Sequence, residues 1–318
     1  MDITAGLLQN PLDHSLFAPT AARIGALLMV GALLVGVVER KRWRDLRETT
    51  LFKRVFSWAV MAPTFLLAVF VGGPIGLVII VYLIVQGLAE YTRLVGIERN
   101  YAWLLVFAGV ATPMLTGLLS PYFLFAPLAF FVLVTLIPII SGQVQGAHLQ
   151  VTSALFGFMY LPFFLSYLVF IRVVEPDGIE MLLLVGVSVA LSDVIAFVVG
   201  STVGGPRIAP KVSPNKTWAG ASGNIIGAFA GLALMWFAIP DDWSLATRII
   251  TPLVLGLAAL WGDLIESFVK RDFKVKDAGT LLPGFGGVLD RIDSLLVALP
   301  ISYYAIVITQ HFSDGPRA

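Results

Sequence analysis

Long apolar stretches separated by short polar segments dominate the pattern of this chain. Ten such stretches occur, near residues 20–38, 55–72, 75–91, 102–119, 122–140, 151–171, 179–199, 221–239, 249–266 and 295–311. They lack the alternation of apolar and polar positions that marks the strands of a membrane barrel. A helix needs about 20 apolar residues to cross the hydrocarbon core of a bilayer. The pattern therefore predicts an all-α, polytopic integral membrane protein with about ten transmembrane helices and polar loops.

The composition supports a membrane location and narrows the chemistry. Of the 318 residues, 13% are charged and 58% are hydrophobic, whereas a soluble domain carries about 25% charged residues. The net charge of +1 indicates no field that would attract nucleic acid. The absence of cysteine excludes disulfides, thiolate zinc sites and cysteine nucleophiles, and the three distant histidines form no metal-binding motif.

The distribution of lysine and arginine predicts the orientation of the spans. Cytoplasmic loops of membrane proteins are enriched in these residues. With the N-terminus outside, 17 of the 21 lysines and arginines fall in cytoplasmic loops or at cytoplasmic helix ends. We therefore expect both termini outside and the two most polar loops in the cytoplasm. The basic stretch 39–54 would mainly anchor this topology, with binding of anionic lipid headgroups as a secondary role.

The chain is expected to divide into two parts. Residues 1–54 would hold the first span and a basic cytoplasmic loop, and residues 55–318 would form one polytopic domain. The opening stretch lacks a basic segment and a small-residue cleavage site, so we expect no removable signal peptide. The sequence shows no internal repeat and no low-complexity segment.

The charged residues concentrate in residues 263–293, which hold 11 of them in about a tenth of the chain. The first part of this segment carries polar residues at helical spacing, which places them in one stripe at the end of a membrane helix. They are Asp263, Glu266, Ser267, Lys270 and Arg271. An acidic residue at membrane depth such as Asp263 is costly and is a candidate functional residue. A purely structural pair of Asp263 with Arg271 is the alternative.

The second part of this segment is a glycine-rich loop followed by two carboxylates. Gly284, Gly286 and Gly287 permit close backbone approach, so the loop can present N–H groups to phosphate oxygens. Asp290 and Asp293 then share one helix face at the start of the last span, where a helix N-terminus favours negative charge. Carboxylates with few other ligands suit Mg²⁺, which keeps water and phosphate oxygens as its remaining ligands. A plain turn and simple helix capping are the alternatives.

A second polar segment spans residues 192–220. Asp193 lies within an apolar stretch with no basic residue within four positions, so its partner is expected in another segment, and a metal ion is a candidate. The loop that follows combines small residues, hydroxyls and cations, which suit a polyanion such as a triphosphate. It includes Lys211, Ser213, Asn215, Lys216 and Thr217. The GxxxxGK[ST] pattern of a P-loop is absent, and ordinary basic decoration of a cytoplasmic loop is the alternative.

These residues resemble the signature of the phosphatidate cytidylyltransferases (CDP-diacylglycerol synthases). The resemblance rests on fixed spacing over 27 residues, from Ser267, Lys270, Arg271, Lys276 and Asp277 through Leu282-Pro283-Gly284 and Gly286-Gly287 to Asp290, Arg291 and Asp293. Asp193 and the stretch Ser213-Pro214-Asn215-Lys216-Thr217-Trp218 are similar to the family's second polar segment. The chain departs from the family at Phe285, where His is usual, at Ala219, where Glu is usual, and at Asn215, where Lys is common.

The resemblance implies the reaction of CTP with phosphatidic acid to give CDP-diacylglycerol and pyrophosphate in phospholipid biosynthesis. It implies Mg²⁺ as cofactor, with a second metal ion left open, held by Asp193, Asp263, Asp290 and Asp293. It assigns catalytic roles to Lys270, Arg271, Lys276, Asp277 and Arg291. It assigns substrate binding to Lys211, Ser213, Asn215, Lys216, Thr217, Ser267, Gly286 and Gly287.

The same resemblance and the topology together suggest the cellular setting. We expect an integral protein of the bacterial inner (cytoplasmic) membrane, surrounded by membrane lipids, with its site facing the cytoplasm. We expect no nucleic-acid partner, and a homodimer is left open.

Phe285 and Ala219 leave two further interpretations open. One is the same chemistry on another lipid phosphate, and the other is a non-catalytic paralogue that binds lipid or a partner enzyme. A transporter that uses Asp193 and Asp263 as an ion path is disfavoured, because the charges cluster at one face and no inverted repeat is evident.

Overall fold

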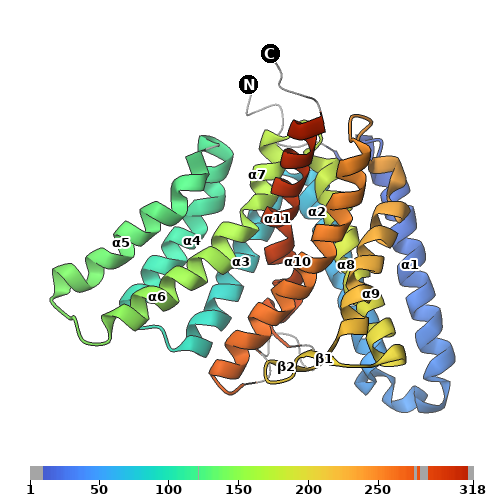
Figure 1. Cartoon of the computed structure of the whole chain (residues 1–318), viewed down its shortest axis with the longest axis horizontal. Coiled ribbons are helices and arrows are strands. Elements are labelled where there is room, and N and C mark those ends of the chain that lie inside the picture. The colour runs from blue at the N-terminus through green and yellow to red at the C-terminus, as the bar shows by residue number, and fades with distance from the viewer. Residues whose placement is uncertain (1–9, 121, 276–277, 280–285, 314–318) are drawn as a thin grey trace.

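The structure, a computed structural model, describes residues 10–120, 122–275, 278–279 and 286–313. Helices make up most of these residues (Figure 1). The α-helices are α1 (Phe17–Val38), α2 (Thr50–Val71), α3 (Gly73–Val95), α4 (Arg99–Leu119), α5 (Ala126–Ser141), α6 (Ala147–Phe158), α7 (Tyr167–Val174), α8 (Gly178–Val203), α9 (Trp218–Leu234), α10 (Leu245–Asp272) and α11 (Leu289–Ser313). Short helical turns are η1 (Pro11–Asp13), η2 (Arg40–Glu48), η3 (Tyr122–Phe125), η4 (Met159–Phe163) and η5 (Trp236–Ala238).

Each apolar stretch of the sequence lies on helical structure, which confirms the predicted all-α, polytopic architecture. Nine helical segments among the described residues are long and apolar enough to cross a membrane. The remaining stretch forms α9, which has 17 residues and is therefore about 25 Å long. The predicted division of the chain after residue 54 falls inside α2 and stays a prediction.

The span Ala147–Val174 contains a wide π-type turn at η4. Pro162 lies in this turn, and because proline has no N–H group it cannot continue the regular hydrogen-bond ladder. The span is largely buried inside the bundle. From this turn Tyr160 donates a hydrogen bond to the carbonyl of Gly262 in α10 at 3.4 Å. The turn thus ties the apolar core to the helix that carries the predicted polar stripe.

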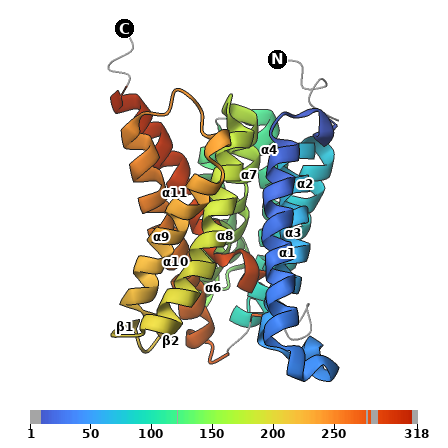
Figure 2. The same cartoon turned by 90° about the vertical axis from the view of Figure 1, so that its right-hand side faces the viewer.

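Successive spans run in alternate directions (Figures 1 and 2). The chain forms a small antiparallel hairpin of β1 (Arg207–Ala209) and β2 (Ser213–Thr217) between α8 and α9. This hairpin and η2 lie at one end of the bundle, whereas α1 begins and α11 ends at the opposite end. We call these the hairpin end and the terminal end. The second polar segment of the sequence therefore lies at the hairpin end.

Glycines allow α8 and α9 to pack backbone against backbone. Gly223, Gly227 and Gly231 lie four residues apart on one face of α9. A Cβ atom at Gly223 would lie 2.8 Å from the Cα of Ala196, and one at Gly227 would lie 2.6 Å from the Cα of Ser192. Small residues at this spacing are typical of closely packed membrane helices. The approach fixes Asp193, the neighbour of Ser192, at the level of the middle of α9.

Gly262 has the same role between α10 and α11. A Cβ atom at this position would lie 2.9 Å from the Cα of Ser294 and would overlap the carbonyl oxygen of Asp293. Because the two backbones touch here, Asp263 and Asp293 are brought to the same level of the bundle. The helix packing therefore sets the spacing of the carboxylates that the sequence singled out.

Replacement of Gly227 by alanine should disrupt the contact between α8 and α9. The added methyl group has no room against Ser192, so we expect a loss of about 1–3 kcal/mol in the free energy of unfolding. Thermal unfolding in detergent micelles measures the effect. Gly36→Ala is the matched control, because a Cβ atom at Gly36 meets nothing within 4 Å. Equal melting temperatures for the two variants would contradict the proposed close packing.

Candidate active site

Carboxylates and lysines from four elements meet near the hairpin end. We call this set the carboxylate–lysine cluster. It consists of Asp193 in α8, Lys216 in β2, Asp263, Glu266 and Lys270 in α10, and Asp290 and Asp293 in α11. Two ion-pair contacts join the elements, one from Lys216 to Asp263 and one from Lys270 to Asp290. The structure therefore unites the two polar segments that are about 70 residues apart in the sequence.

Lys216 reaches from the hairpin into a group of three carboxylates. Its ammonium forms an ion pair with Asp263 and also interacts electrostatically with Asp193 and Asp293. Burial disfavours the charged ammonium, but the attraction of Asp263 and the other carboxylates outweighs this effect and raises the pKa of Lys216. The side chain is 24% exposed. Asp193 thus has a cationic neighbour in the hairpin that follows its own helix, within the same polar segment.

Hydroxyl and amide groups hold the carboxylates around Lys216 in place. Ser294 donates its hydroxyl to Asp193 at 3.2 Å and its backbone N–H to Asp293 at 2.8 Å. Ser267, one turn along α10, donates its hydroxyl to Asp263 at 3.3 Å. Ser267, predicted to bind substrate, therefore orients a carboxylate in the structure. The predicted polar stripe along α10 is present.

Lys270 joins α10 to the first turn of α11. Its ammonium contacts Glu266 one turn earlier in α10 and lies 2.7 Å from Asp290. The other oxygen of Asp290 accepts the N–H groups of Gly287 at 2.7 Å and Ala278 at 3.1 Å. Asp290 is thus enclosed by one ammonium and two backbone donors. Its side chain is 11% exposed and that of Lys270 is 12% exposed.

Glu90 is a further member of the site, one of the two interpretations that the sequence leaves open for this residue. It lies near the end of α3, is 3% exposed, and accepts the N–H groups of Val288 and Leu289, each at 3.0 Å. These groups lie at the start of α11, so Glu90 satisfies donors that a helix leaves unpaired and places negative charge at its positive end. The sequence alone leaves open whether Glu90 contributes to the site or forms a helix-end ion pair with Arg93, because contacts with backbone N–H groups about 200 residues away leave no local pattern.

The glycines before α11 permit this capping contact. A Cβ atom at Gly279 would lie 2.7 Å from the carboxyl carbon of Glu90, and one at Gly287 would overlap a Glu90 oxygen. Gly286 has φ +81°, which favours glycine. The N–H groups of residues 287–289 are thus given to Asp290 and Glu90 within the protein, rather than presented to an outside phosphate.

Other predicted residues lie around the hairpin. Arg271 is exposed and donates to the carbonyls of Val212 at 3.3 Å and Val275 at 3.0 Å, so it holds the hairpin against α10. The hydroxyl of Thr217 caps α9 by accepting the N–H of Gly220 at 3.1 Å. Lys211 and Asn215 are exposed. The remaining predicted residues are the half-buried Ser213 of β2 and the half-buried Arg291, which follows Asp290 in α11.

Six positions of the predicted signature lie outside the described residues. They are Lys276 and Asp277, to which the resemblance assigns catalytic roles, the stretch Leu282-Pro283-Gly284, and Phe285, where the chain departs from the family pattern. Ala219, the other departure, lies in the first turn of α9.

The chemistry of the cluster fits a divalent cation. Within the described residues, no three His, Cys, Asp or Glu side chains are arranged as a metal-binding group. Instead, the ammonium of Lys216 forms an ion pair with Asp263 and is attracted by Asp193 and Asp293, so a cation is already favoured at this place. Carboxylate oxygens are the ligands that Mg²⁺ takes in proteins. The donor types therefore suit the predicted cofactor, and the Mg²⁺ site itself stays a prediction.

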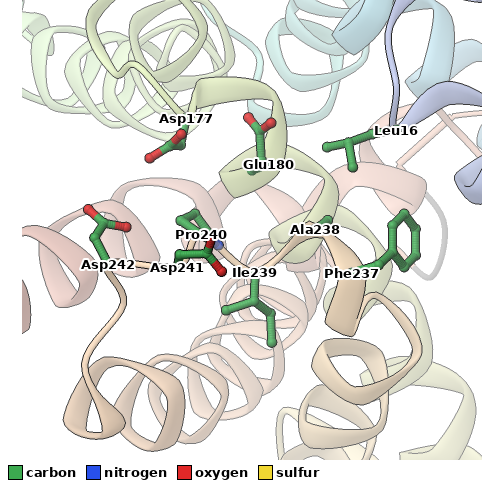
Figure 3. Close-up of a pocket in the computed structure, with 9 residues that line it drawn as sticks. All are labelled: Leu16, Asp177, Glu180, Phe237, Ala238, Ile239, Pro240, Asp241 and Asp242. Atoms are coloured by element: carbon green, nitrogen blue, oxygen red, sulfur yellow. The ribbon is translucent and has the colours of Figure 1, made fainter.

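A cavity of about 460 Å³ lies at the terminal end. Figure 3 shows its carboxylates Asp177, Glu180, Asp241 and Asp242 together with apolar residues such as Phe237. A cavity whose charged lining is acidic repels phosphate groups. The carboxylate–lysine cluster, which contains cations as well as acids, is therefore the better candidate for phosphate chemistry.

Comparison with known proteins identifies relatives of this chain. Residues 52–309 match the sequence profile described as "Cytidylyltransferase family". A protein named phosphatidate cytidylyltransferase from Brucella abortus is 41% identical over 149 residues, which are 46% of this chain and 54% of that protein. The matched part thus spans about half the length of that relative.

Two further relatives extend the comparison. A phosphatidate cytidylyltransferase from Rickettsia bellii is 35% identical over 184 residues, covering 55% of this chain and 79% of its own. An uncharacterized protein, YnbB, from Escherichia coli K12 is 30% identical over 304 residues, covering 93% of this chain and 98% of its own.

Glu90→Gln should destabilise the protein. The substitution removes the negative charge and leaves one of the two N–H donors at Val288 and Leu289 facing an amide NH₂ group. Hydrogen bonds to charged groups contribute about 1.5–3 kcal/mol, so we expect a loss of that order in the free energy of unfolding. Thermal unfolding in detergent measures it, with the exposed Glu98→Gln as control. A melting temperature equal to that of the control would refute the capping role.

The acidic cavity predicts a dependence of stability on pH. Burial and the nearby Asp242 raise the pKa of Asp177. The folded protein therefore binds this proton more tightly than the unfolded chain, and Asp177 lowers stability as the pH rises. Asp242→Asn should raise the melting temperature at pH 7 and leave it unchanged at pH 3, where the carboxyls are protonated. Asp241→Asn is the control, and an equal increase at both pH values would argue against this electrostatic origin.

Proposed function

The chain belongs to the cytidylyltransferase family, and from that membership we propose that it transfers CMP from CTP to phosphatidic acid, giving CDP-diacylglycerol and pyrophosphate. The observation that carries the proposal is the carboxylate–lysine cluster, which is built from residues of the family signature and joins α8, β2, α10 and α11. The names of the Brucella and Rickettsia relatives support the choice of substrates.

The reaction needs charge neutralisation and alignment more than proton transfer. A phosphate oxygen of the lipid attacks the α-phosphorus of CTP in line, a new P–O bond forms, and the bond to pyrophosphate breaks with its electron pair. A phosphate monoester has a second pKa of about 6, so the nucleophile is ionised near neutral pH without a general base. Two anions must approach each other, and holding them in alignment lowers the barrier.

The cations of the site are proposed to bind these phosphates. Lys270 is fixed between Glu266 and Asp290, so its ammonium is held in one place and costs little further ordering when a phosphate binds. Lys216 reaches the cluster from the hairpin side. Arg291 and Lys276 are assigned to the same phosphates by the signature, and Lys211, Ser213 and Asn215 to the rim of the site.

Mg²⁺ is proposed as the cofactor, held by Asp193, Asp263, Asp290 and Asp293. When bound, it would neutralise phosphate charge and favour departure of pyrophosphate. Gly262 and Ser294 keep Asp193, Asp263 and Asp293 at one level of the bundle, independently of any bound ion.

The location in the cell follows from the same proposal. The protein is an integral membrane protein by its helices and its family, and we propose that its hairpin end faces the cytoplasm, where CTP is available. The basic residues of η2 lie at this end, as positive-inside topology requires. The bacterial inner membrane is the proposed membrane.

Another lipid phosphate is the alternative acceptor. Ala219, in the first turn of α9 beside the hairpin, replaces the Glu that the family usually carries. YnbB, which matches 93% of this chain, has a name that states no substrate. A comparison of acceptors in one assay decides between the two acceptors.

Purified protein in lipid vesicles should convert labelled CTP to a CDP-lipid in the presence of Mg²⁺. Phosphatidic acid and a panel of other lipid phosphates serve as acceptors, and mass spectrometry identifies the product. Absence of product with every acceptor would defeat the proposal and favour a non-catalytic role in lipid binding.

Asp290→Ala should reduce turnover by roughly 100- to 1,000-fold, the effect typical of losing one group that stabilises the transition state. Asp272→Ala removes an exposed carboxylate from the end of α10 and is the matched control. Melting temperatures show whether each variant is folded. Turnover by a folded Asp290→Ala protein at the rate of the control would contradict the assignment of the site.

A further inference from the structure

Lys216 occupies an unusual position for a lysine of a short hairpin. Its ammonium pairs with Asp263 and is attracted by Asp193 and Asp293, and these three carboxylates come from three different membrane helices. The contact with Asp263 is an ion pair. The fold of the hairpin does not require a lysine that reaches into the bundle. The attraction of the three carboxylates therefore accounts for the position of this ammonium.

One ammonium cannot neutralise this group. Asp193, Asp263 and Asp293 together carry up to three negative charges, whereas Lys216 supplies one positive charge. Attraction between opposite charges grows with the product of the charges and with the fall in dielectric constant. A divalent cation would therefore be held more strongly than the ammonium at the same oxygens. Lys216 and such a cation cannot both bind the same carboxylate oxygen of Asp263.

The backbone around Lys216 is fixed, but its ammonium is free to change partners. Thr217 caps α9, and Arg271 holds the carbonyl of Val212 at the other end of β2. Between these points, Lys216 has a flexible stem of four carbons and a compact charge. The ammonium can thus exchange one anion for another while the hairpin stays in place.

We propose that Lys216 is an internal counter-ion that takes the place of the divalent cation when no substrate is bound. Lys216 leaves Asp263 when the cation binds, and its ammonium then pairs with a phosphate of the incoming nucleotide. The first half of this exchange rests on the ion pair and on the proposed metal site, and the second half rests in addition on the proposed function. Free metal displaces Lys216 from Asp263 and offers its ammonium no other anion, whereas a nucleotide supplies a phosphate. The site therefore favours a metal–nucleotide complex over the free metal.

The proposal predicts competition between Lys216 and metal. Two ligands that exclude each other weaken each other's binding by the same factor. Lys216→Met removes the ammonium and keeps most of the side-chain length. We expect this variant to bind Mn²⁺, without nucleotide, roughly 5- to 100-fold more tightly than the wild-type protein. The full chain in detergent is titrated, and electron paramagnetic resonance measures free Mn²⁺.

A matched control separates this exchange from general charge effects. Arg207→Met removes one positive charge from the same hairpin at an exposed position, and it should change the affinity for Mn²⁺ by less than about twofold. Equal affinities for the Lys216→Met, Arg207→Met and wild-type proteins would overturn the proposal. So would the absence of Mn²⁺ binding to all three proteins.

A second measurement uses the wild-type protein and does not depend on the folding of a variant. Acetylation of lysines by a water-soluble active ester is followed at each lysine by mass spectrometry. Lys216 should react slowly in the metal-free protein, where the carboxylates enclose it, and faster once Mg²⁺ is added. The exposed Lys274 serves as internal reference. An unchanged rate at Lys216 with saturating Mg²⁺ would overturn the proposal.

The nucleotide arm distinguishes this inference from the proposed function. Addition of CTP with Mg²⁺ should slow the acetylation of Lys216 again, because a phosphate takes up the ammonium. If Mg²⁺ exposes Lys216 but CTP has no effect and no CDP-lipid forms, the counter-ion role stands and the proposed function fails. If CDP-lipid forms but removal of Lys216 leaves Mn²⁺ affinity unchanged, the proposed function stands and the counter-ion role fails.

Discussion

The requirement that buried charge be neutralised governs the hairpin end of this protein. Asp193, Asp263 and Asp293 lie on helices that are apolar over most of their length, where an isolated carboxylate is strongly disfavoured. Each is supported by a donor from another element or from its own backbone: Lys216 from the hairpin, and the hydroxyl and N–H of Ser294 from α11. The hairpin is held at the bundle by the same interaction that makes the carboxylates tolerable. Structure and chemistry at this end therefore have a common origin.

The carboxylates of the site have two kinds of partner, backbone N–H groups and lysine ammonium groups. Glu90 is paired with backbone N–H groups, which cannot move away without unwinding the first turn of α11. Asp263 is paired with the ammonium of a flexible side chain, which can move without disturbing the backbone. Asp290 has both, since it accepts two N–H groups on one oxygen and contacts Lys270 with the other. The backbone N–H groups fix the geometry of the site, whereas a flexible ammonium can leave its carboxylate oxygens free to bind another cation.

Much of the architecture was predictable because hydropathy alone identifies membrane helices. The ten apolar stretches, the polar stripe of α10 and the start of the last helix next to Asp290 all appear where the sequence indicates. The need of Asp193 for a partner was also evident, although not that Lys216 in the following hairpin would supply a nearby charge. For Glu90, a place in the site and an ion pair with Arg93 were both open, because distant backbone donors carry no side-chain signature. The contact of Arg271 with the hairpin backbone was not predicted, and its catalytic role stays a prediction.

The contact between Glu90 and α11 has a consequence for how the protein is made. A ribosome delivers the chain from its N-terminus, so α3 enters the membrane long before the last helix exists. Until residues 288 and 289 emerge, the carboxylate of Glu90 lacks the two N–H groups that receive its charge in the finished protein. The site therefore cannot close on a partially synthesised chain, because a polypeptide that ends before α11 offers Glu90 the amide of Gln86 but not the two backbone donors. The polar centre can therefore assemble fully only after the last helix has been synthesised.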